Sequence, residues 1–81
     1  MIKELFLYSS KECTLCESMQ KELDKVCSSR GLSYHTIDIS DDPELQHRYG
    51  ARLPVLVSGN EEICELVFDT KAFNNYVLAH D

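Results

Sequence analysis

The chain has 81 residues, of which 43% are hydrophobic and 27% are charged, and its net charge is −6. These values predict one soluble domain over residues 1–81, with a thin core. They argue against two classes of partner. An acidic chain has no Lys/Arg stripe for the phosphates of nucleic acid, and the longest apolar run, LPVLV, is far below the roughly 20 residues of a membrane-spanning helix.

The first predicted elements are a strand and a long helix. The segment IKELFLY, residues 2–8, is mostly apolar, which indicates a central strand. From Thr14 to Arg30, apolar residues recur at spacings of three and four, as on one face of a helix. Thr14 and Glu17 would form a capping box at its start, and Gly31 suits the position just after its end. The buried face is predicted to contain Leu15, Met19, Leu23, Val26 and Cys27.

A second strand and a short helix follow. The segment LSYHTIDI, residues 32–39, is predicted to be a strand because its apolar residues alternate. The segment SDDPELQHRYG, residues 40–50, is predicted to be a short helix. Asp41 or Asp42 is a suitable N-cap, and Gly50 is expected to end the helix.

The last predicted elements are a β-hairpin and a closing helix. The segments PVLVS, residues 54–58, and EEICELVF, residues 61–68, are predicted strands joined by a tight Gly-Asn turn. Residues 69–80 are predicted to form a helix with Asp69 or Thr70 as its cap. The order is therefore β-α-β-α-β-β-α, and a right-handed crossover makes the first two strands parallel neighbours. This order predicts an α/β fold, with a four-stranded mixed sheet and helices on both faces.

Two cysteines, Cys13 and Cys16, lie three residues apart at the junction between the first strand and the first helix. Their spacing allows three interpretations: a redox-active pair, half of a metal site, or two inert thiols. The N-terminal residues lack the pattern of a secretory signal, so we expect a cytoplasmic protein. There a close Cys pair is more often catalytic or metal-binding than structural. The place of the pair in a βαβ unit favours redox activity.

The start of the first helix favours Cys13 as the attacking thiol. Free N–H groups and the positive end of the helix dipole stabilise a thiolate there, and they can lower its pKa from about 8.5 to between about 3.5 and 7.5. Lys11 favours the thiolate while Glu12 and Glu17 oppose it, so we expect a modest depression of the pKa. Cys16 lies one turn further along the same face, where it could form a disulfide with Cys13 and release a bound substrate.

The remaining cysteines and the histidines do not indicate a second site. Cys27 lies almost three turns beyond Cys16, too far along the helix to complete the same mononuclear metal site, and Cys64 has no partner at ligand spacing. Both are predicted to be small buried hydrophobic residues. The three histidines lie on different predicted elements, so no metal is expected from them. The spacing leaves one metal-binding alternative, a metal cluster that is bridged between two chains through Cys13.

Three motifs follow one another in a specific order: LYSSKECTLCESM, then IDISDDPELQHRYGARLPVLV, then the hairpin and the final helix. Over almost its whole length the chain therefore resembles the glutaredoxin-like branch of the thioredoxin superfamily. The resemblance implies a thioredoxin-like fold and a thiol–disulfide oxidoreductase acting in cell redox homeostasis and electron transport through Cys13 and Cys16. It also implies that Pro54 is cis and faces the cysteine pair, and that the backbone of Leu53 is exposed to pair with an extended substrate.

The chain departs from the usual glutaredoxin pattern at three places. The cysteines enclose Thr-Leu instead of Pro-Tyr, and Lys11 lies two residues before the first cysteine instead of three. Many relatives carry a Gly-Gly pair before the last helix that helps to hold glutathione, and here CELVFDTKAF has bulky residues in that region. Asp69 and Thr70 stand near the family's glutathione contacts, which makes them candidates for substrate binding, with helix capping as the alternative role.

These features define two hypotheses about function. The first is an oxidoreductase whose partner is a disulfide-containing protein or a low-molecular-weight thiol, with no bound cofactor and with glutathione as a candidate co-substrate. The alternative is a non-catalytic thioredoxin-fold module that recognises a partner through the surface around Pro54. The missing glycine pair and the Pro-free turn favour the alternative. In both cases we expect a monomer, because no long exposed apolar segment requires a second copy.

Overall fold

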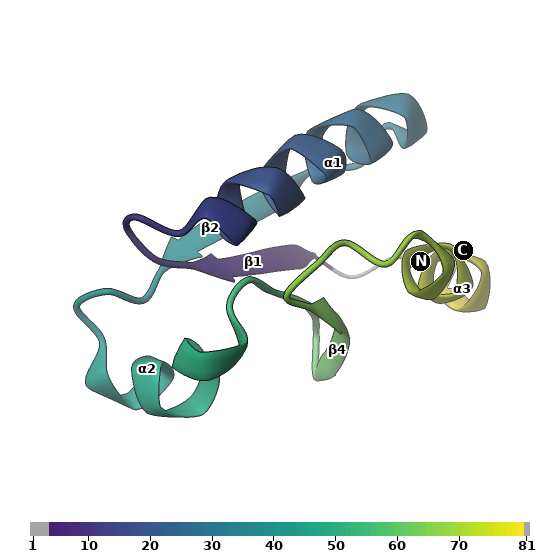
Figure 1. Ribbon diagram of the computed structural model, residues 1–81. Helices are drawn as coiled ribbons and strands as arrows, with labels where there is room; N and C mark the ends of the chain where they lie inside the picture. The colour runs from purple at the N-terminus through teal and green to yellow at the C-terminus, as the bar shows by residue number, and fades with distance from the viewer. Residues whose placement is uncertain (1–3, 81) are drawn as a thin grey trace.

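The computed structural model describes residues 4–80, which form four strands and three α-helices (Figure 1). The strands make one mixed sheet in the order β2-β1-β3-β4. Strand β1 is parallel to β2 and antiparallel to β3, and β3 is antiparallel to β4. This arrangement confirms the predicted sheet and the central place of the first strand. In chain order the elements are β1 Leu5–Ser9, α1 Thr14–Arg30, β2 Tyr34–Asp38, α2 Pro43–Tyr49, the 3₁₀ turn η1 Gly50–Arg52, β3 Val55–Ser58, β4 Glu61–Glu65 and α3 Thr70–His80.

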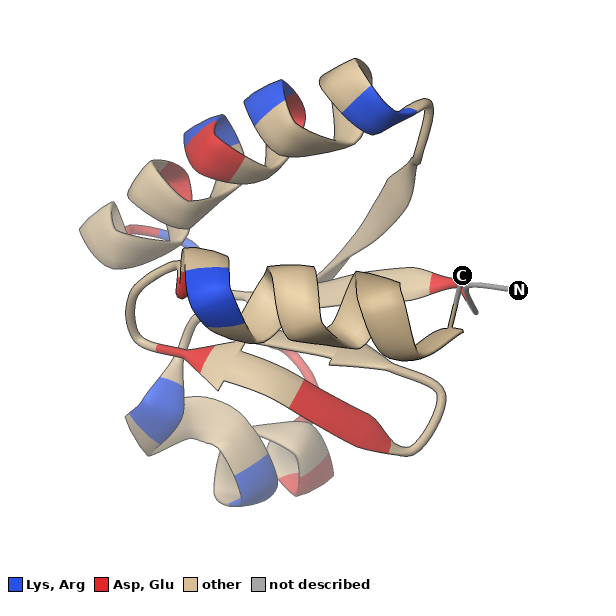
Figure 2. Ribbon diagram, turned by 90° about the vertical axis from the view of Figure 1, so that its right-hand side faces the viewer, with Lys and Arg blue, Asp and Glu red and all other residues tan. Residues whose placement is uncertain are grey.

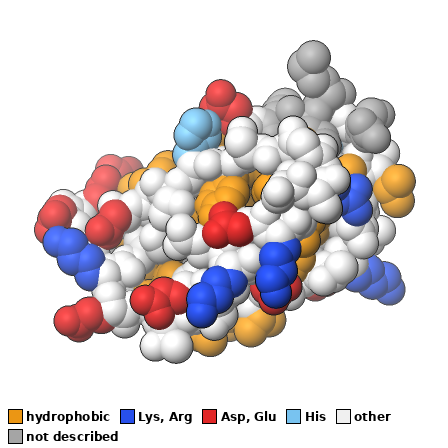
Figure 3. All heavy atoms as spheres, turned by 90° about the horizontal axis from the view of Figure 1, so that it is seen from above, with side chains coloured by type: hydrophobic (Ala, Val, Ile, Leu, Met, Phe, Trp, Pro, Cys, Tyr) orange, Lys and Arg blue, Asp and Glu red, His pale blue; other side chains and the backbone are white. Residues whose placement is uncertain are grey.

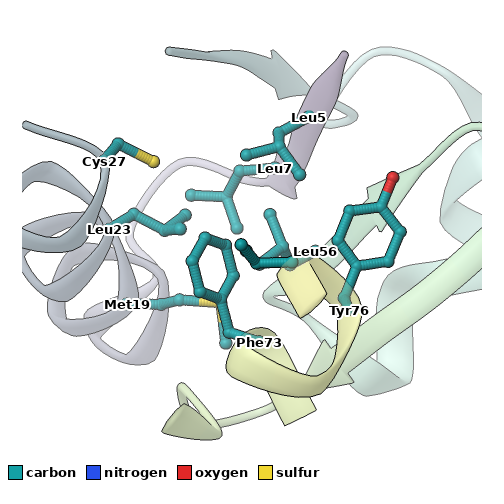
Figure 4. Packing of buried hydrophobic residues seen from close by; sticks show 9 residues of the cluster. Leu5, Leu7, Met19, Leu23, Cys27, Leu56, Phe73 and Tyr76 are labelled. Carbon is teal, nitrogen blue, oxygen red and sulfur yellow. The ribbon is translucent and has the colours of Figure 1, made fainter. Parts of the chain in front are cut away.

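Helices cover both faces of the sheet, as predicted, with α1 above the strands and α2 below them in Figure 1. On one face, Leu5, Leu7 and Leu56 pack against α1 and α3 (Figure 4). The helices contribute Met19, Leu23, Cys27, Phe73, Tyr76 and Val77 to that cluster. On the other face, Val55 and Val57 pack with Ile39 and with Tyr49 of α2. Successive residues of a strand point to opposite faces, so β3 is buried on both sides.

Helix α1 has the predicted bounds, and Met19, Leu23 and Cys27 of its predicted inner face are buried. Leu15 is 46% exposed, so its predicted place in the core is wrong. Cys16 begins the buried row instead and is followed by Met19, Leu23 and Cys27. Leu15 and Cys16 lie four and three residues before Met19, and both spacings fit one side of a helix. At this end of α1 Cys16 is buried, while Leu15 faces a groove described below.

The cap of α1 also differs from the prediction. The N-cap is Cys13, whose Sγ accepts a hydrogen bond from the backbone N–H of Cys16 at 3.1 Å. Thr14 is the first helical residue, so the predicted capping box of Thr14 and Glu17 is wrong. The end of the helix is as predicted, because Gly31 has a left-handed φ of 68° and its N–H bonds back to the last turn.

Helix α2 is capped by Asp42, whose side chain accepts a hydrogen bond from the N–H of Leu45 at 3.1 Å. The α-helix ends at Tyr49, but Gly50 does not end it as a left-handed glycine. Its φ of −54° and ψ of −36° are right-handed, and the chain continues as η1. None of the helices between residues 4 and 80 has the length and apolar character needed to cross a membrane.

Strand β4 is shorter than predicted, because it ends at Glu65 and not at residue 68. Leu66 has a left-handed φ of 69°, which turns the chain out of the sheet. Its N–H still donates a hydrogen bond to the carbonyl oxygen of Pro54 at 2.8 Å. Helix α3 then begins as predicted, with Asp69 Oδ1 accepting a hydrogen bond from the N–H of Ala72 at 3.0 Å.

Candidate functional site

Cys13 and Cys16 form a disulfide at the N-terminal end of α1. Their Cα atoms are 5.2 Å apart, within the range that a disulfide needs. The two residues differ in access to solvent, since Cys13 is half-buried whereas Cys16 is only 4% exposed. A molecule arriving from solvent therefore reaches Cys13 more easily than Cys16.

The backbone at the start of α1 favours negative charge on the Cys13 sulfur. The sulfur accepts the N–H of Cys16 at 3.1 Å, and the Cys13 carbonyl accepts the N–H of Glu17 at 3.2 Å, which closes the first turn of the helix. When the disulfide is reduced, the same N–H group and the positive end of the helix dipole would face a thiolate. These are the features that stabilise an anionic sulfur at a helix start.

The turn that leads into Cys13 is tied to the end of β2. The N–H of Lys11 donates a hydrogen bond to Ser40 Oγ at 3.1 Å, and the N–H of Ser40 donates to Asp38 Oδ1 at 2.8 Å. The hydrogen bonds from Ser40, with a smaller contribution from the charge of Lys11, hold the pKa of Asp38 below its ordinary value. Glu12 follows with a left-handed φ of 57°, an uncommon conformation for a residue with a side chain. The charge of Lys11 therefore acts on Asp38 at the end of β2.

The peptide bond between Leu53 and Pro54 is cis, as the resemblance implied. Tyr8 of β1 pairs with Val55 of β3. Because the two strands are antiparallel, Pro54, which precedes Val55, lies at the carboxyl end of β1, from which the chain runs on to the cysteine pair. The side chain of Pro54 is buried and that of Leu53 is half-buried against the α2 side of the sheet. The sheet register thus brings this bond and the disulfide to the same end of the molecule.

The loop before the cis bond is fixed by Arg52, which the sequence did not single out. Its guanidinium lies 2.7 Å from a carboxylate oxygen of Glu62 and 3.4 Å from one of Glu65, and 5.4 Å above the ring of Tyr49. The hydrogen bond from Arg52 holds the pKa of Glu62 below its ordinary value. These contacts tie η1 to β4. Arg52 precedes Glu62 by ten residues and Glu65 by thirteen, so their spacing gave no signal, and the three residues meet only when the hairpin folds.

Asp69 and Thr70 lie at the start of α3, where Asp69 is the N-cap and Thr70 is the first helical residue. The predicted capping role of Asp69 is thereby confirmed. Substrate contact by either residue stays a prediction.

A groove with a volume of about 260 Å³ lies between α1 and the segment that joins β4 to α3. Three large apolar side chains are exposed along it: Leu15 by 46%, Leu66 by 43% and Val67 by 63%. Leu15 lies between the two cysteines in the chain, so this end of the groove is one residue from Cys16 and two from Cys13. The remaining lining residues are Ser18, Met19, Glu22, Phe68 and Thr70. Sequence reasoning missed the groove because it assigned Leu15 to the core and residues 66–68 to a strand, although their bulk in place of a glycine pair was a signal.

The other two cysteines differ in burial. Cys27 is 3% exposed, as predicted, and burial together with the charge of Asp24 raises the pKa of its thiol. Cys64 is half-buried, less than predicted, and burial raises its pKa as well. Over the described residues 4–80, no three His, Cys, Asp or Glu side chains gather in a way that could hold a metal ion.

Comparison with known proteins places the fold. The family model described as "Glutaredoxin-like domain (DUF836)" matches residues 4–78. The chain is similar to the X-ray structure of protein XcR50 from X. campestris, with 29% identity over 93% of this chain and 96% of that chain and a TM-score of 0.76. It is also similar to the solution structure of protein Ne2328 from Nitrosomonas europaea, with 27% identity over 94% and 92% of the two chains and a TM-score of 0.82.

A more distant likeness concerns the fold alone. Thioredoxin 1 from Thermosipho africanus is 13% identical over 95% of this chain and 92% of that chain, with a TM-score of 0.65. The search of curated proteins found no match. The predicted thioredoxin-like fold is confirmed, and a Cys-x-x-Cys disulfide at the start of its first helix fits a redox role.

Proposed function

The chain belongs to the glutaredoxin-like (DUF836) family, and from this we propose that it is a thiol–disulfide oxidoreductase with Cys13 as nucleophile and Cys16 as resolving thiol. One observation carries the proposal: the two cysteines are bonded at the start of α1, with the sulfur that caps the helix more accessible than the other. Access and the helix dipole favour the same atom as the point of attack.

The proposed reaction transfers two electrons from the protein dithiol to a substrate disulfide. The Cys13 thiolate attacks one substrate sulfur, a mixed disulfide forms, and the other substrate sulfur leaves and takes up a proton. Cys16 then loses its proton and attacks the Cys13 sulfur. The bond to the substrate breaks, the second substrate thiol is released, and the Cys13–Cys16 disulfide forms. An external thiol or dithiol reduces this disulfide and completes the cycle.

The proposed substrate site lies between the cysteine pair and the cis bond. The backbone of Leu53, next to Pro54, would pair with an extended substrate in the manner of an added strand. Lys11 would favour the Cys13 thiolate through its charge, while Asp69 and Thr70 are secondary candidates for contact. The proposed partners are disulfide-containing proteins or low-molecular-weight thiols, with glutathione as a candidate co-substrate, and the proposed setting is a monomer in the cytoplasm.

Cysteine variants test the assignment. The fully reduced protein is mixed with a small disulfide, and the thiol released in a single turnover is measured. We expect Cys13→Ser to abolish the release, because no accessible thiolate remains. Cys16→Ser should release one substrate thiol and retain the other as a mixed disulfide detectable by mass. Cys64→Ser removes a half-buried thiol outside the motif and should react like the unmodified protein. Residual activity in Cys13→Ser equal to that of the unmodified protein would rule out the assignment.

The second candidate is the non-catalytic binding module. The exposed Leu66 and Val67, in the region where many relatives have glycines, favour it. A reduction potential measured against glutathione separates the two functions. A value in the range of thioredoxins and glutaredoxins, roughly −200 to −270 mV, supports the oxidoreductase. The module is supported if the disulfide forms only slowly and if Cys13, in the reduced protein, has the pKa of a free thiol.

A further inference from the structure

We propose that the groove beside the disulfide is a docking site that selects protein substrates, namely an extended segment with an apolar side chain next to its reactive cysteine and a basic residue close by. This inference rests on the proposed function and adds the class of substrate.

Exposed apolar side chains of this protein gather at the groove. Four large apolar side chains are exposed within residues 4–80, and three of them, Leu15, Leu66 and Val67, line it. The fourth, Leu78, lies near the far end of α3. Single exposed apolar residues are ordinary on protein surfaces, whereas a group beside a reactive centre indicates a binding surface. Met19, which is a core residue and only 1% exposed, forms the base of the groove.

Leu66 has an unfavourable backbone conformation with its side chain left in solvent. Its φ of 69° is unfavourable for a residue with a Cβ, and glycine would avoid this cost. The chain is held there by the hydrogen bond from the Leu66 N–H to the carbonyl oxygen of Pro54 at 2.8 Å. The side chain is 43% exposed, so core packing does not account for a leucine at this position. A contact with a substrate would account for it.

The position of the groove suits the residue next to a substrate cysteine. Leu15 stands between the two cysteines, and Leu66 is bonded to Pro54, so the groove borders both parts of the proposed active site. The starts of α1 and α3, which frame it, lie at the same end of the molecule in Figure 2. A substrate held through Cys13 places its neighbouring residue within about 3.5 Å of chain length, and the lining residue Leu15 is only two residues from Cys13.

The charge around the groove favours a basic segment. Among residues 4–80, Glu22 is the single charged residue that lines the groove. The lining residue Thr70 is flanked by one negative charge, Asp69, and one positive charge, Lys71. Figure 3, which looks down on α1, shows acidic and basic side chains around exposed apolar patches. The net charge of −6 adds a long-range attraction for cationic partners. Glutathione, a small acidic tripeptide without a large apolar side chain, uses neither feature.

A matched set of peptides tests the proposal. Each peptide has one cysteine joined by a disulfide to thionitrobenzoate, whose release is followed by absorbance after mixing with the reduced protein. The set contains Leu or Ser next to the cysteine, combined with Arg or Glu two residues away, and hydroxyethyl disulfide serves as an uncharged reference. We expect the Leu/Arg peptide to react at least about tenfold faster than the Ser/Glu peptide, equivalent to about 1.4 kcal/mol, and faster than the same disulfide of glutathione.

Four variants assign that preference to the groove. Leu66→Ser should remove the preference for Leu, whereas Leu78→Ser, an equal change on an exposed leucine elsewhere, should keep it. Glu22→Lys should reverse the preference for Arg over Glu. Asp41→Lys changes the net charge equally on an exposed residue outside the groove and should keep the preference. Circular dichroism of all four establishes that they are folded.

The outcomes separate this inference from the proposed function. If the reference disulfide is reduced but all peptides react equally, the docking site is wrong and the oxidoreductase stands. The same holds if the glutathione disulfide reacts faster than the Leu/Arg peptide, or if Leu78→Ser loses the preference as fully as Leu66→Ser. If neither the reference nor any peptide is reduced, the proposed function itself is overturned.

Discussion

Cys13 has two roles at the start of α1, since its sulfur is both the helix cap and the proposed nucleophile. Ser, Thr, Asp and Asn are the usual N-cap residues because their oxygens accept the free N–H groups of the first turn. Here the Cys13 sulfur accepts the N–H of Cys16 instead, at 3.1 Å. The same hydrogen bond that begins the helix would therefore stabilise the thiolate after reduction. Residues that shift charge near this atom should act directly on its reactivity.

Lys11 and Glu12 should shift the pKa of reduced Cys13 in opposite directions. Glu12→Gln removes a negative charge next to the thiolate and should lower the pKa, while Lys11→Gln should raise it. Each effect on the pKa should be small, because both side chains are exposed and screened by solvent. Thiolate absorbance against pH measures it. Burial raises the pKa of Cys27 and Cys64, so the first thiolate to form on raising the pH should belong to the motif. Shifts of equal sign in the two variants would contradict the assignment.

Glu12 should also be a point of backbone strain. Its φ of 57° is left-handed, and Glu12→Gly removes the Cβ that makes this conformation unfavourable. We expect the oxidised variant to gain about 1 kcal/mol in free energy of unfolding, measured by urea titration. Glu17→Gly is the matched control, because Glu17 is exposed inside α1, where glycine should cost about 1 kcal/mol. A loss of stability in both variants would show that Glu12 is not strained.

At the scale of elements, the parts that could be predicted are those fixed by local patterns. The bounds of α1 follow from its apolar spacing and from Gly31, and the N-cap of α2 follows from Asp42. The parts that were wrongly predicted depend on long-range contacts. Strand β4 ends where it does because Leu66 adopts a left-handed conformation, which is usual for glycine and not for leucine. Leu66 is held there by its hydrogen bond to Pro54 across the hairpin. Leu15 could not be told from a core residue by helical spacing alone.

The candidate site divides in the same way. The motif of Cys13 and Cys16 was recognisable because its chemistry is encoded by two neighbours in the chain, and the cis bond at Pro54 came from the resemblance alone. X–Pro bonds are cis in only about 5–6% of cases, so nothing local predicted it. The groove and the contacts of Arg52 with β4 join segments that are distant in sequence. Such features become visible only after the chain has folded.

The cap of α3 separates a structural role of Asp69 from a role in binding. Asp69→Ala should lower the free energy of unfolding by about 1 kcal/mol, because the N–H of Ala72 loses its acceptor. Asp69→Asn keeps an acceptor oxygen without the charge, so it should recover most of this loss. Chemical denaturation of the three proteins measures the effect. If Asp69→Asn is fully stable yet reduces disulfides at an altered rate, Asp69 also acts on substrate.

At the scale of the whole molecule, the sheet separates two cores of unequal size. Among residues 4–80, the cluster under α1 and α3 contains nine buried residues, while the cluster under α2 contains four. The free energy gained by burial rises with apolar area, so the α2 side is the weaker half. Helix α1 contributes Met19, Leu23 and Cys27 to the larger cluster. The helix that carries the disulfide is therefore anchored in the larger core.

This difference predicts that α2 opens before the rest of the molecule. Native-state hydrogen exchange should show amides of α2 exchanging at least about tenfold faster than those in the middle of α1, through openings that expose only part of the chain. Low urea concentrations distinguish the two routes. Exchange in α1 should accelerate with urea because it follows global unfolding, whereas exchange in α2 should respond weakly because little surface is exposed. Equal protection and equal urea dependence in both helices would mean that the two cores unfold as one cooperative unit, and that α2 is no weaker than the half carrying the cysteines.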